Sequence, residues 1–184
     1  MKAATTVMNA KTYALATMTE IAAALDLRDA TLYYYYPNKQ ALAYACHCRS
    51  IKRFETFVLA AGHGAATGSD KLRTFLSLLL THFEANGPLL YFGEYFYLER
   101  KQRKAIATEA ERLTRMLEDF LKTGIVDGSV TPCETELVVQ LLLGMLIWLA
   151  KWVDTVEGIT VDRLMIAMDG FCLRGLDTRN VSTE

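Results

Sequence analysis

Apolar residues recur along most of the chain at spacings of three and four, the period of an α-helix rather than of a β-strand. Breaks in this pattern fall at Gly, Pro, Asn and Asp residues, so the segments between them are expected to be separate helices. The pattern therefore predicts an all-α protein. The expected helices span residues 2–9, 17–25, 30–36, 39–61, 71–85, 99–122, 132–153 and 160–172.

Local signals mark where these helices should begin and end. A hydroxyl followed three residues later by a carboxylate forms a capping box, which satisfies two backbone N–H groups at a helix start. Gly124 is expected to end the long helix that begins near residue 99, because glycine readily adopts the left-handed conformation beyond a helix end. Capping boxes are expected at Thr17–Glu20 and Thr131–Glu134, and N-caps at Asn38 and Thr160.

Two short helices, a tight turn and a following long helix have the geometry of a helix-turn-helix, which places its second helix in the major groove of DNA. The stretch from Thr19 to Leu42 reads TEIAAALDLRDATLYYYYPNKQAL. It resembles the DNA-binding signature of the tetracycline-repressor (TetR) family, I-A-x-x-x-G-V-S-x-x-T-L-Y-x-H-F-x-x-K-x-x-L. The matching positions are Ile21, Ala22, Leu27, Thr31, Leu32, Tyr33, Lys39 and Leu42, and Lys11-Thr12-Tyr13 stands where the family usually has Lys-Gly-Tyr.

The resemblance implies an N-terminal three-helix helix-turn-helix domain over residues 1–45 and a helical-bundle domain for ligand binding and dimerisation over 46–184. It implies a transcriptional regulator, expected to be a repressor that binds a palindromic operator as a dimer and is released by a small hydrophobic effector. Because hydroxyls donate to phosphates and aromatic faces contact thymine methyl groups, Tyr34 is expected to reach bases, and its neighbours the DNA backbone. The candidate DNA-binding residues are Thr17, Thr19, Arg28, Thr31, Tyr33, Tyr34, Tyr35 and Lys39.

Departures from the family pattern concern the turn and the charge. Asp26 replaces the turn glycine and is tolerable there, because Asp enters the left-handed region more readily than most residues. Arg28 replaces a capping serine, Asp29 adds a negative charge, and the first helix is short, without a basic arm. Residues 1–60 carry seven Lys/Arg against four Asp/Glu (+3), and residues 61–184 carry thirteen against seventeen (−4). The alternatives are a ligand-binding dimer with weak or lost DNA binding, and a tyrosine row that only forms a helix edge.

The second half of the chain contains a helix that is apolar on nearly every face, over residues 137–152. Such a helix must be covered on more than one side. Together with the last helix it would form a four-helix bundle with a second copy, which the resemblance implies as a homodimer through the helices near 134–153 and 160–176. The alternative is that residues 137–152 form the central core of a monomer.

Aromatic residues and methionines of the second half are candidates for a pocket that binds a small hydrophobic effector. The family resemblance implies such a pocket, and its candidate lining is poor in charge, which favours an apolar ligand. Ordinary core packing is the alternative for each residue. The candidates are Phe83, Phe92, Tyr95, Phe96, Met116, Phe120 and Met145, with His82 and Glu94 as polar groups.

Other kinds of chemistry find little support in the sequence. No nucleophile–base pair or glycine-rich phosphate loop accompanies the histidines, so we expect no enzyme activity and no cofactor, although a small helical enzyme with a buried apolar site is an alternative. The thiols of Cys46-His47-Cys48 point about 200° apart on a helix, which argues against a metal and for buried apolar thiols. Residues 137–150 are too short to span a membrane, and the absence of a signal peptide favours a cytoplasmic location.

Overall fold

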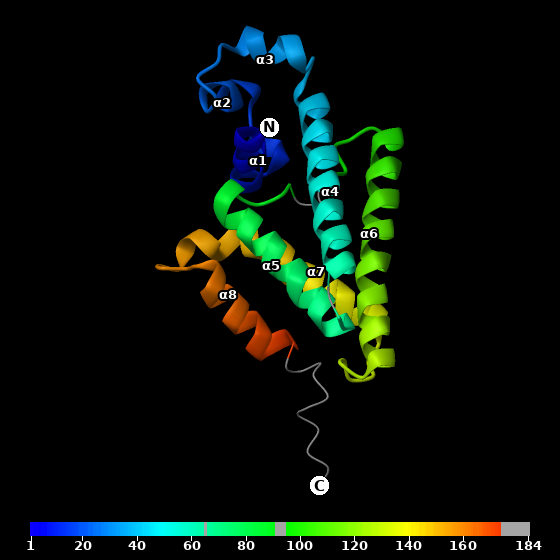
Figure 1. The fold of residues 1–184 in the computed structure, drawn as a ribbon. Coiled ribbons are helices and arrows are strands. Elements are labelled where there is room, and N and C mark those ends of the chain that lie inside the picture. Colours follow the sequence, from blue (N-terminus) through cyan, green and yellow to red (C-terminus); the bar gives the residue numbers. More distant parts are fainter. Residues whose placement is uncertain (65, 91–94, 174–184) are drawn as a thin grey trace. The chain divides into compact units, whose positions relative to one another are not determined.

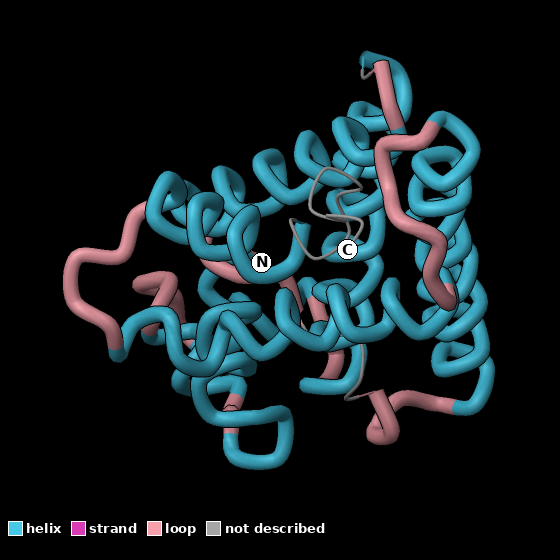
Figure 2. Tube along the Cα trace, turned by 90° about the horizontal axis from the view of Figure 1, so that it is seen from below, coloured by secondary structure: helices cyan, strands magenta, loops and turns pink. Residues whose placement is uncertain are grey.

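Helices are the only regular secondary structure among the residues that the structure, a computed structural model, describes: 1–64, 66–90 and 95–173 (Figures 1 and 2). The all-α prediction is therefore confirmed. The helices are α1 (Lys2–Leu15), α2 (Met18–Ala23), α3 (Asp29–Tyr35), α4 (Lys39–Gly64), α5 (Gly68–Asn86), α6 (Arg100–Asp127), α7 (Thr135–Trp152) and α8 (Val161–Met168), with a 3₁₀ turn at Val153–Thr155 and a π turn at Asp169–Leu173.

Internal contacts divide the chain into two units. The first unit combines Met1–Arg53 with Ala85–Ala110, and the second combines Phe54–Glu84 with Glu111–Glu184. Helices α4 and α6 each contribute residues to both units. The domain boundaries at 1–45 and 46–184 remain a prediction. By their contacts, residues 85–110 are grouped with the N-terminal residues.

The first unit is built around a small apolar core beneath α1, α2 and the start of α4. Leu32 of α3 is buried in it, and Tyr36 packs against it, as the helical spacing predicts. Leu25, which follows α2, is 38% exposed. The buried residues of this core are Ala4, Met8, Ala16, Met18, Ile21, Ala22, Leu32, Leu42, Ala43, Cys46 and Leu90.

The connection between α5 and α6 belongs to this first unit and is tied to two of its helices. Lys2 of α1 donates from Nζ to the carbonyl oxygen of Ala85 (3.1 Å), and Asn9 of α1 donates from Nδ2 to that of Leu89 (3.1 Å). The backbone N–H of Leu90 donates to the hydroxyl of Ser50 in α4 (2.9 Å). Residues 85–90 therefore lie against both α1 and α4.

In the second unit, the N-terminus of α5 crosses the C-terminal part of α6 at two glycines. A Cβ on Gly68 would lie 2.1 Å from the backbone nitrogen of Gly124, and a Cβ on Gly124 would lie 2.4 Å from Cγ2 of Val130. The prediction that Gly124 ends α6 is wrong, because the helix continues to Asp127 and is followed by Gly128 with φ +79°. Gly124 is required for close packing and not for a helix end.

The predicted N-caps are confirmed at three of four positions. Thr17, Asn38 and Thr160 each accept a hydrogen bond from a backbone N–H in the first turn of α2, α4 and α8. The predicted box at Thr131 is wrong: α7 begins only at Thr135, and its N-cap residue Glu134 makes no capping hydrogen bond through its side chain. The hydroxyl of Thr135 donates instead to Glu118 in α6 (2.8 Å), so a tertiary contact takes the place of a capping box at the start of α7.

Replacing Gly124 by Ala should lower the free energy of unfolding by about 1–3 kcal/mol, because the new methyl group overlaps Val130 in a packed contact. Gly62→Ala in α4 is the matched control, since its Cβ would meet the Phe120 ring at an ordinary 3.7 Å and alanine favours the helix. Chemical denaturation measures both variants. Equal stability of the two would contradict the close-packing role of Gly124.

Candidate nucleic-acid interface

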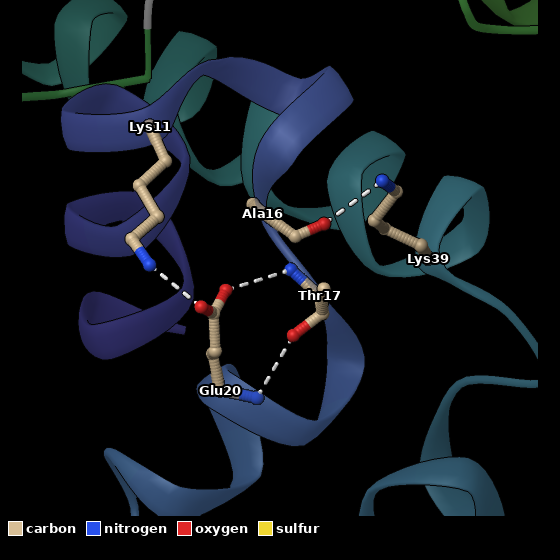
Figure 3. A network of polar contacts seen from close by, with 5 residues as sticks. All are labelled: Lys11, Ala16, Thr17, Glu20 and Lys39. Atoms are coloured by element: carbon tan, nitrogen blue, oxygen red, sulfur yellow. Dashed lines mark hydrogen bonds and ion pairs between the residues drawn. The ribbon is translucent and has the colours of Figure 1, made fainter.

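The start of α2 is fixed by a complete capping box (Figure 3). The backbone N–H of Glu20 donates to the hydroxyl of Thr17 (3.2 Å), and the N–H of Thr17 donates to Oε2 of Glu20 (3.1 Å). Lys11 of α1 reaches the other carboxylate oxygen of Glu20 at 2.6 Å. The hydrogen bond from Lys11, and then that from the Thr17 backbone, lower the pKa of Glu20, so this carboxylate stays ionised and links α1 to α2.

The turn between α2 and α3 follows the family pattern although its residues differ. Asp26 occupies the position of the turn glycine with φ +54°, as expected for a residue that tolerates the left-handed region. Arg28 is the N-cap of α3 and makes no side-chain cap, which confirms the missing cap. Asp29 is not a bare negative charge, because its Oδ2 accepts a hydrogen bond from the hydroxyl of Thr19 (2.6 Å). This bond ties α3 to α2.

Helix α3 presents a row of hydroxyl and aromatic groups to solvent. Leu32 faces the core, whereas Thr31, Tyr33, Tyr34 and Tyr35 are exposed, Tyr34 to 84%. The rings of Tyr34 and Tyr35 lie edge to face with centroids 5.2 Å apart. The outward direction predicted for these side chains is therefore confirmed, and the surface offers hydroxyl donors and an aromatic face.

Lys39, the first residue of α4, points toward the end of α1 (Figure 3). Its Nζ donates to the carbonyl oxygens of Tyr13 (2.8 Å), Ala14 (3.3 Å) and Ala16 (2.8 Å), and lies 4.4 Å from the centre of the Tyr13 ring. The last carbonyls of a helix lack partners within the helix, and a cation there is favourable. The structure thus gives all three ammonium protons an acceptor inside the unit, a role that the sequence did not reveal.

The backbone just before these carbonyls is unusual. Thr12 has φ +67° and ψ 162°, a region that is essentially restricted to glycine. It stands where the family usually has glycine, in the Lys11-Thr12-Tyr13 segment, and it produces a kink within α1. The contacts of Lys39 and of the Tyr13 ring hold this strained turn in place.

Tyr97, in the segment before α6, completes the anchoring of this unit. Its ring stacks on that of Tyr13 with centroids 3.4 Å apart and planes 4° from parallel. Its hydroxyl lies 2.8 Å from Nε2 of the fully buried His47, and its carbonyl accepts a hydrogen bond from the Gln40 side chain. Sequence periodicity contained no signal for this cluster, since its members are spread over distant parts of the chain.

The neighbours of His47 follow the helix geometry that argues against a shared metal. Cys46 is buried, which raises the pKa of its thiol, whereas Cys48 is exposed. The prediction that both thiols are buried is therefore wrong for Cys48, because residues two apart on a helix face opposite sides. Among the described residues, no group of three His, Cys, Asp or Glu side chains is arranged to hold a metal ion.

Comparison with known families identifies the chain. Residues 1–46 match the family model for bacterial regulatory proteins of the tetR family, and residues 65–176 match the tetracyclin repressor-like C-terminal domain. The chain belongs to the TetR family. It is therefore a DNA-binding transcriptional regulator, and the exposed α3 is the recognition helix of its TetR-type helix-turn-helix.

Solved structures of TetR regulators share the fold. PfmR from Thermus thermophilus is 23% identical, with a TM-score of 0.78 over 96% of this chain and 97% of that one. AibR, in complex with isovaleryl coenzyme A and operator DNA, is 23% identical, with a TM-score of 0.77 over 94% and 95%. The ketosteroid transcriptional regulator KstR2 of Mycobacterium tuberculosis is 14% identical, with a TM-score of 0.81 over 96% and 92%. No curated protein sequence matches the chain.

The predicted effector-binding residues of this TetR protein are distributed over both units. Tyr95 and Phe96 stack on each other in the first unit, where Phe96 is 77% exposed. In the second unit, Phe83 packs against the cluster of Leu80, Leu149 and Val153. Phe120 is buried beside Gly62, and the sulfur of Met145 lies 3.7 Å from that of Cys172. Met116 is half-buried on α6, and Phe92 and Glu94 lie outside the described residues.

The described part of this TetR chain contains no helix that combines the length and the apolar content needed to cross a membrane.

Substituting Lys39 by Met keeps the aliphatic stem and removes the ammonium group. We expect the free energy of unfolding to fall by at least about 2 kcal/mol, because a single hydrogen bond to a charged group is worth about 1.5–3 kcal/mol and three carbonyls lose their donor. Lys11→Met removes an exposed ion pair and should change stability little. Chemical denaturation compares the two, and similar losses would contradict the anchoring role of Lys39.

Proposed function

We propose that this regulator is a repressor that occupies a palindromic operator as a homodimer and is released by a small hydrophobic effector. The observation that carries the proposal is the exposed row on α3, which is fixed at one end by Thr19–Asp29 and followed by the anchored Lys39. A rigidly held recognition helix reads base edges, and two copies read two half-sites about one helical turn apart.

The proposed contacts divide between phosphates and bases. Thr31, Tyr33 and Tyr35 donate from their hydroxyls to phosphate oxygens, which fixes the register of the protein on the duplex. Tyr34, the most exposed of them, reaches the base edges, where its ring packs against a thymine methyl group. The hydroxyls of Thr17 and Thr19 and the ammonium of Lys39 contribute by positioning the helices. Arg28 supplies the positive charge next to α3.

The proposed dimer uses an apolar stripe on α7 together with α8. Leu137, Leu141, Gly144 and Trp148 lie within about 60° of each other around the helix axis, and all four are exposed. Leu141 is 69% and Trp148 63% exposed, and α8 with its π turn exposes Ile166 and Phe171. Large contiguous apolar surfaces of this kind mark protein interfaces. The glycine in the stripe allows two helices to approach closely.

The proposed effector is a small, largely apolar molecule. The candidate lining residues of the second unit, Phe83, Met116 and Met145, carry no charge, which favours such a ligand. Two proteins of the same fold support the class, since AibR was solved with isovaleryl coenzyme A and operator DNA, and KstR2 is a ketosteroid regulator. Binding would favour a conformation with lower affinity for the operator.

The proposed function is tested by fluorescence anisotropy with the duplex that flanks the gene of this protein and with a scrambled duplex. Wild type should prefer the flanking duplex. Tyr34→Ala should reduce that preference by at least about 10-fold, since each base contact contributes on the order of 1 kcal/mol of discrimination and the dimer makes it in both half-sites. Tyr33→Ala, as the control, should weaken binding to both duplexes alike.

Two results would contradict this proposal. A folded wild-type dimer that binds neither duplex in a salt-sensitive manner would favour a ligand-binding dimer without DNA binding. Equal preference in wild type and Tyr34→Ala would show that the tyrosine row forms a helix edge only.

The dimer is tested separately with Leu141→Glu, which places a charge in the middle of the stripe. We expect its dimer dissociation constant to rise by at least about 30-fold, the effect of losing a central contact of about 2 kcal/mol. Val126→Glu is the control, because Val126 is an exposed apolar residue on α6 outside the stripe. Analytical ultracentrifugation measures both, and an unchanged dimer in Leu141→Glu would place the interface elsewhere.

A further inference from the structure

The first turns of α6 contain four cations in five residues: Arg100, Lys101, Arg103 and Lys104. Three of them are exposed, Arg103 is half-buried, and the first turn of the helix contains no acidic residue. A helix N-terminus carries a partial positive charge, so each cation there is unfavourable by roughly 0.3–1 kcal/mol. The stability of the helix gives no reason for this arrangement. We call these four residues the α6 basic turn.

Within the described residues, the ion pairs of the protein do not include any member of the α6 basic turn. Several cations of the second unit do form ion pairs. Arg73 lies 2.9 Å from Asp169, Arg115 3.3 Å from Glu111, and Lys122 2.9 Å from Glu118. On the same helix, therefore, the cations of the C-terminal half are paired and those of the N-terminal turns are not. A local rule that is broken without internal compensation is expected at a functional site.

The α6 basic turn follows a segment that contacts the start of α4. Gln40, in the first turn of α4, donates to the carbonyl of Tyr97, and the ring of Tyr97 stacks on Tyr13. Only two residues separate Tyr97 from Arg100, and three extended Cα–Cα steps span at most about 10 Å. Figure 1 shows α6 beginning beside the N-terminal half of α4, the helix that follows α3 in the chain. The turn and the recognition helix thus belong to one unit.

The α6 basic turn also supplies four of the eleven Lys/Arg residues of that unit. The first unit contains eleven Lys/Arg against six Asp/Glu, a net charge of +5, whereas the second contains nine against fifteen, a net charge of −6. Without the four cations the first unit would have seven against six, a net charge of only +1. Lys11 and Lys39 already bind Glu20 and backbone carbonyls. The helix-turn-helix stretch Met1–Arg53 itself has seven Lys/Arg against three Asp/Glu, so the α6 basic turn adds cations to a stretch that is already positive.

We propose that the α6 basic turn is an accessory surface that binds the phosphate backbone of duplex DNA next to the segment read by α3. The proposal rests on the DNA binding described above and extends it to residues outside the helix-turn-helix. Duplex DNA presents one negative charge per about 1.7 Å of axis, and each neutralised phosphate adds about 0.9 to the slope of log affinity against log salt. Contacts of this kind raise affinity for all sequences without adding preference for one.

The test uses the intact dimer and the double substitution Arg100→Gln plus Lys104→Gln. Two lost phosphate contacts in each of the two subunits should reduce the salt slope by about 3.6, so that binding becomes about 100-fold less sensitive to salt between about 50 and 200 mM. Preference for the operator over scrambled DNA should be unchanged. The melting temperature should be equal or higher, because two cations leave a helix N-terminus.

The matched control is Arg115→Gln plus Lys122→Gln, which removes one arginine and one lysine from the other half of α6. Its salt slope should equal that of wild type. A wild-type slope in the Arg100→Gln, Lys104→Gln protein, or the same reduced slope in both double variants, would overturn the accessory surface while leaving the proposed function intact. If wild type shows no salt-sensitive DNA binding at all, both proposals fail.

Discussion

The ammonium group of Lys39 closes the C-terminal end of α1 by donating to three carbonyls that the helix itself leaves without partners. The contact joins α1 to the first residue of α4, across the whole helix-turn-helix. It also holds a backbone conformation at Thr12 that a β-branched residue rarely adopts. Because α2 and α3 lie in the chain between these two helices, the Lys39 contact supports the position of the recognition helix together with the Thr19–Asp29 hydrogen bond.

A second set of contacts extends the constraint to a distant part of the sequence. Tyr97 stacks on the same Tyr13 whose carbonyl Lys39 binds, and it is also held by Gln40 and His47 of α4. The connection after α5 reaches α1 and α4 through backbone groups of residues 85–90. The unit that carries the recognition helix is therefore assembled from two separate stretches of chain, and a movement of the second stretch would act directly on the first.

The sequence predicted those features that depend on local chemistry. Helical spacing, the caps at Thr17 and Asn38 and the left-handed Asp26 each follow from residues within one turn of each other. Features set by tertiary contacts were not predictable in this way. Gly124 is required by the close approach of α5 and not by a helix end. Lys39 has the charge of a phosphate ligand, but its ammonium group binds carbonyls 23 to 26 residues earlier in the chain. The exposed row on α3 was predictable because a helix of seven residues with one buried leucine has few choices of face.

The division of the first unit between two stretches has a practical meaning for protein engineering. A chimera that joins this helix-turn-helix to the body of a relative after residue 46 would carry Tyr13, Lys39 and Gln40 but leave Tyr97 and the rest of Ala85–Ala110 behind. At the end of α1, Tyr13 would then contact side chains of the relative in place of Tyr97. A transplant that preserves operator choice has to move both stretches together, as one discontinuous module.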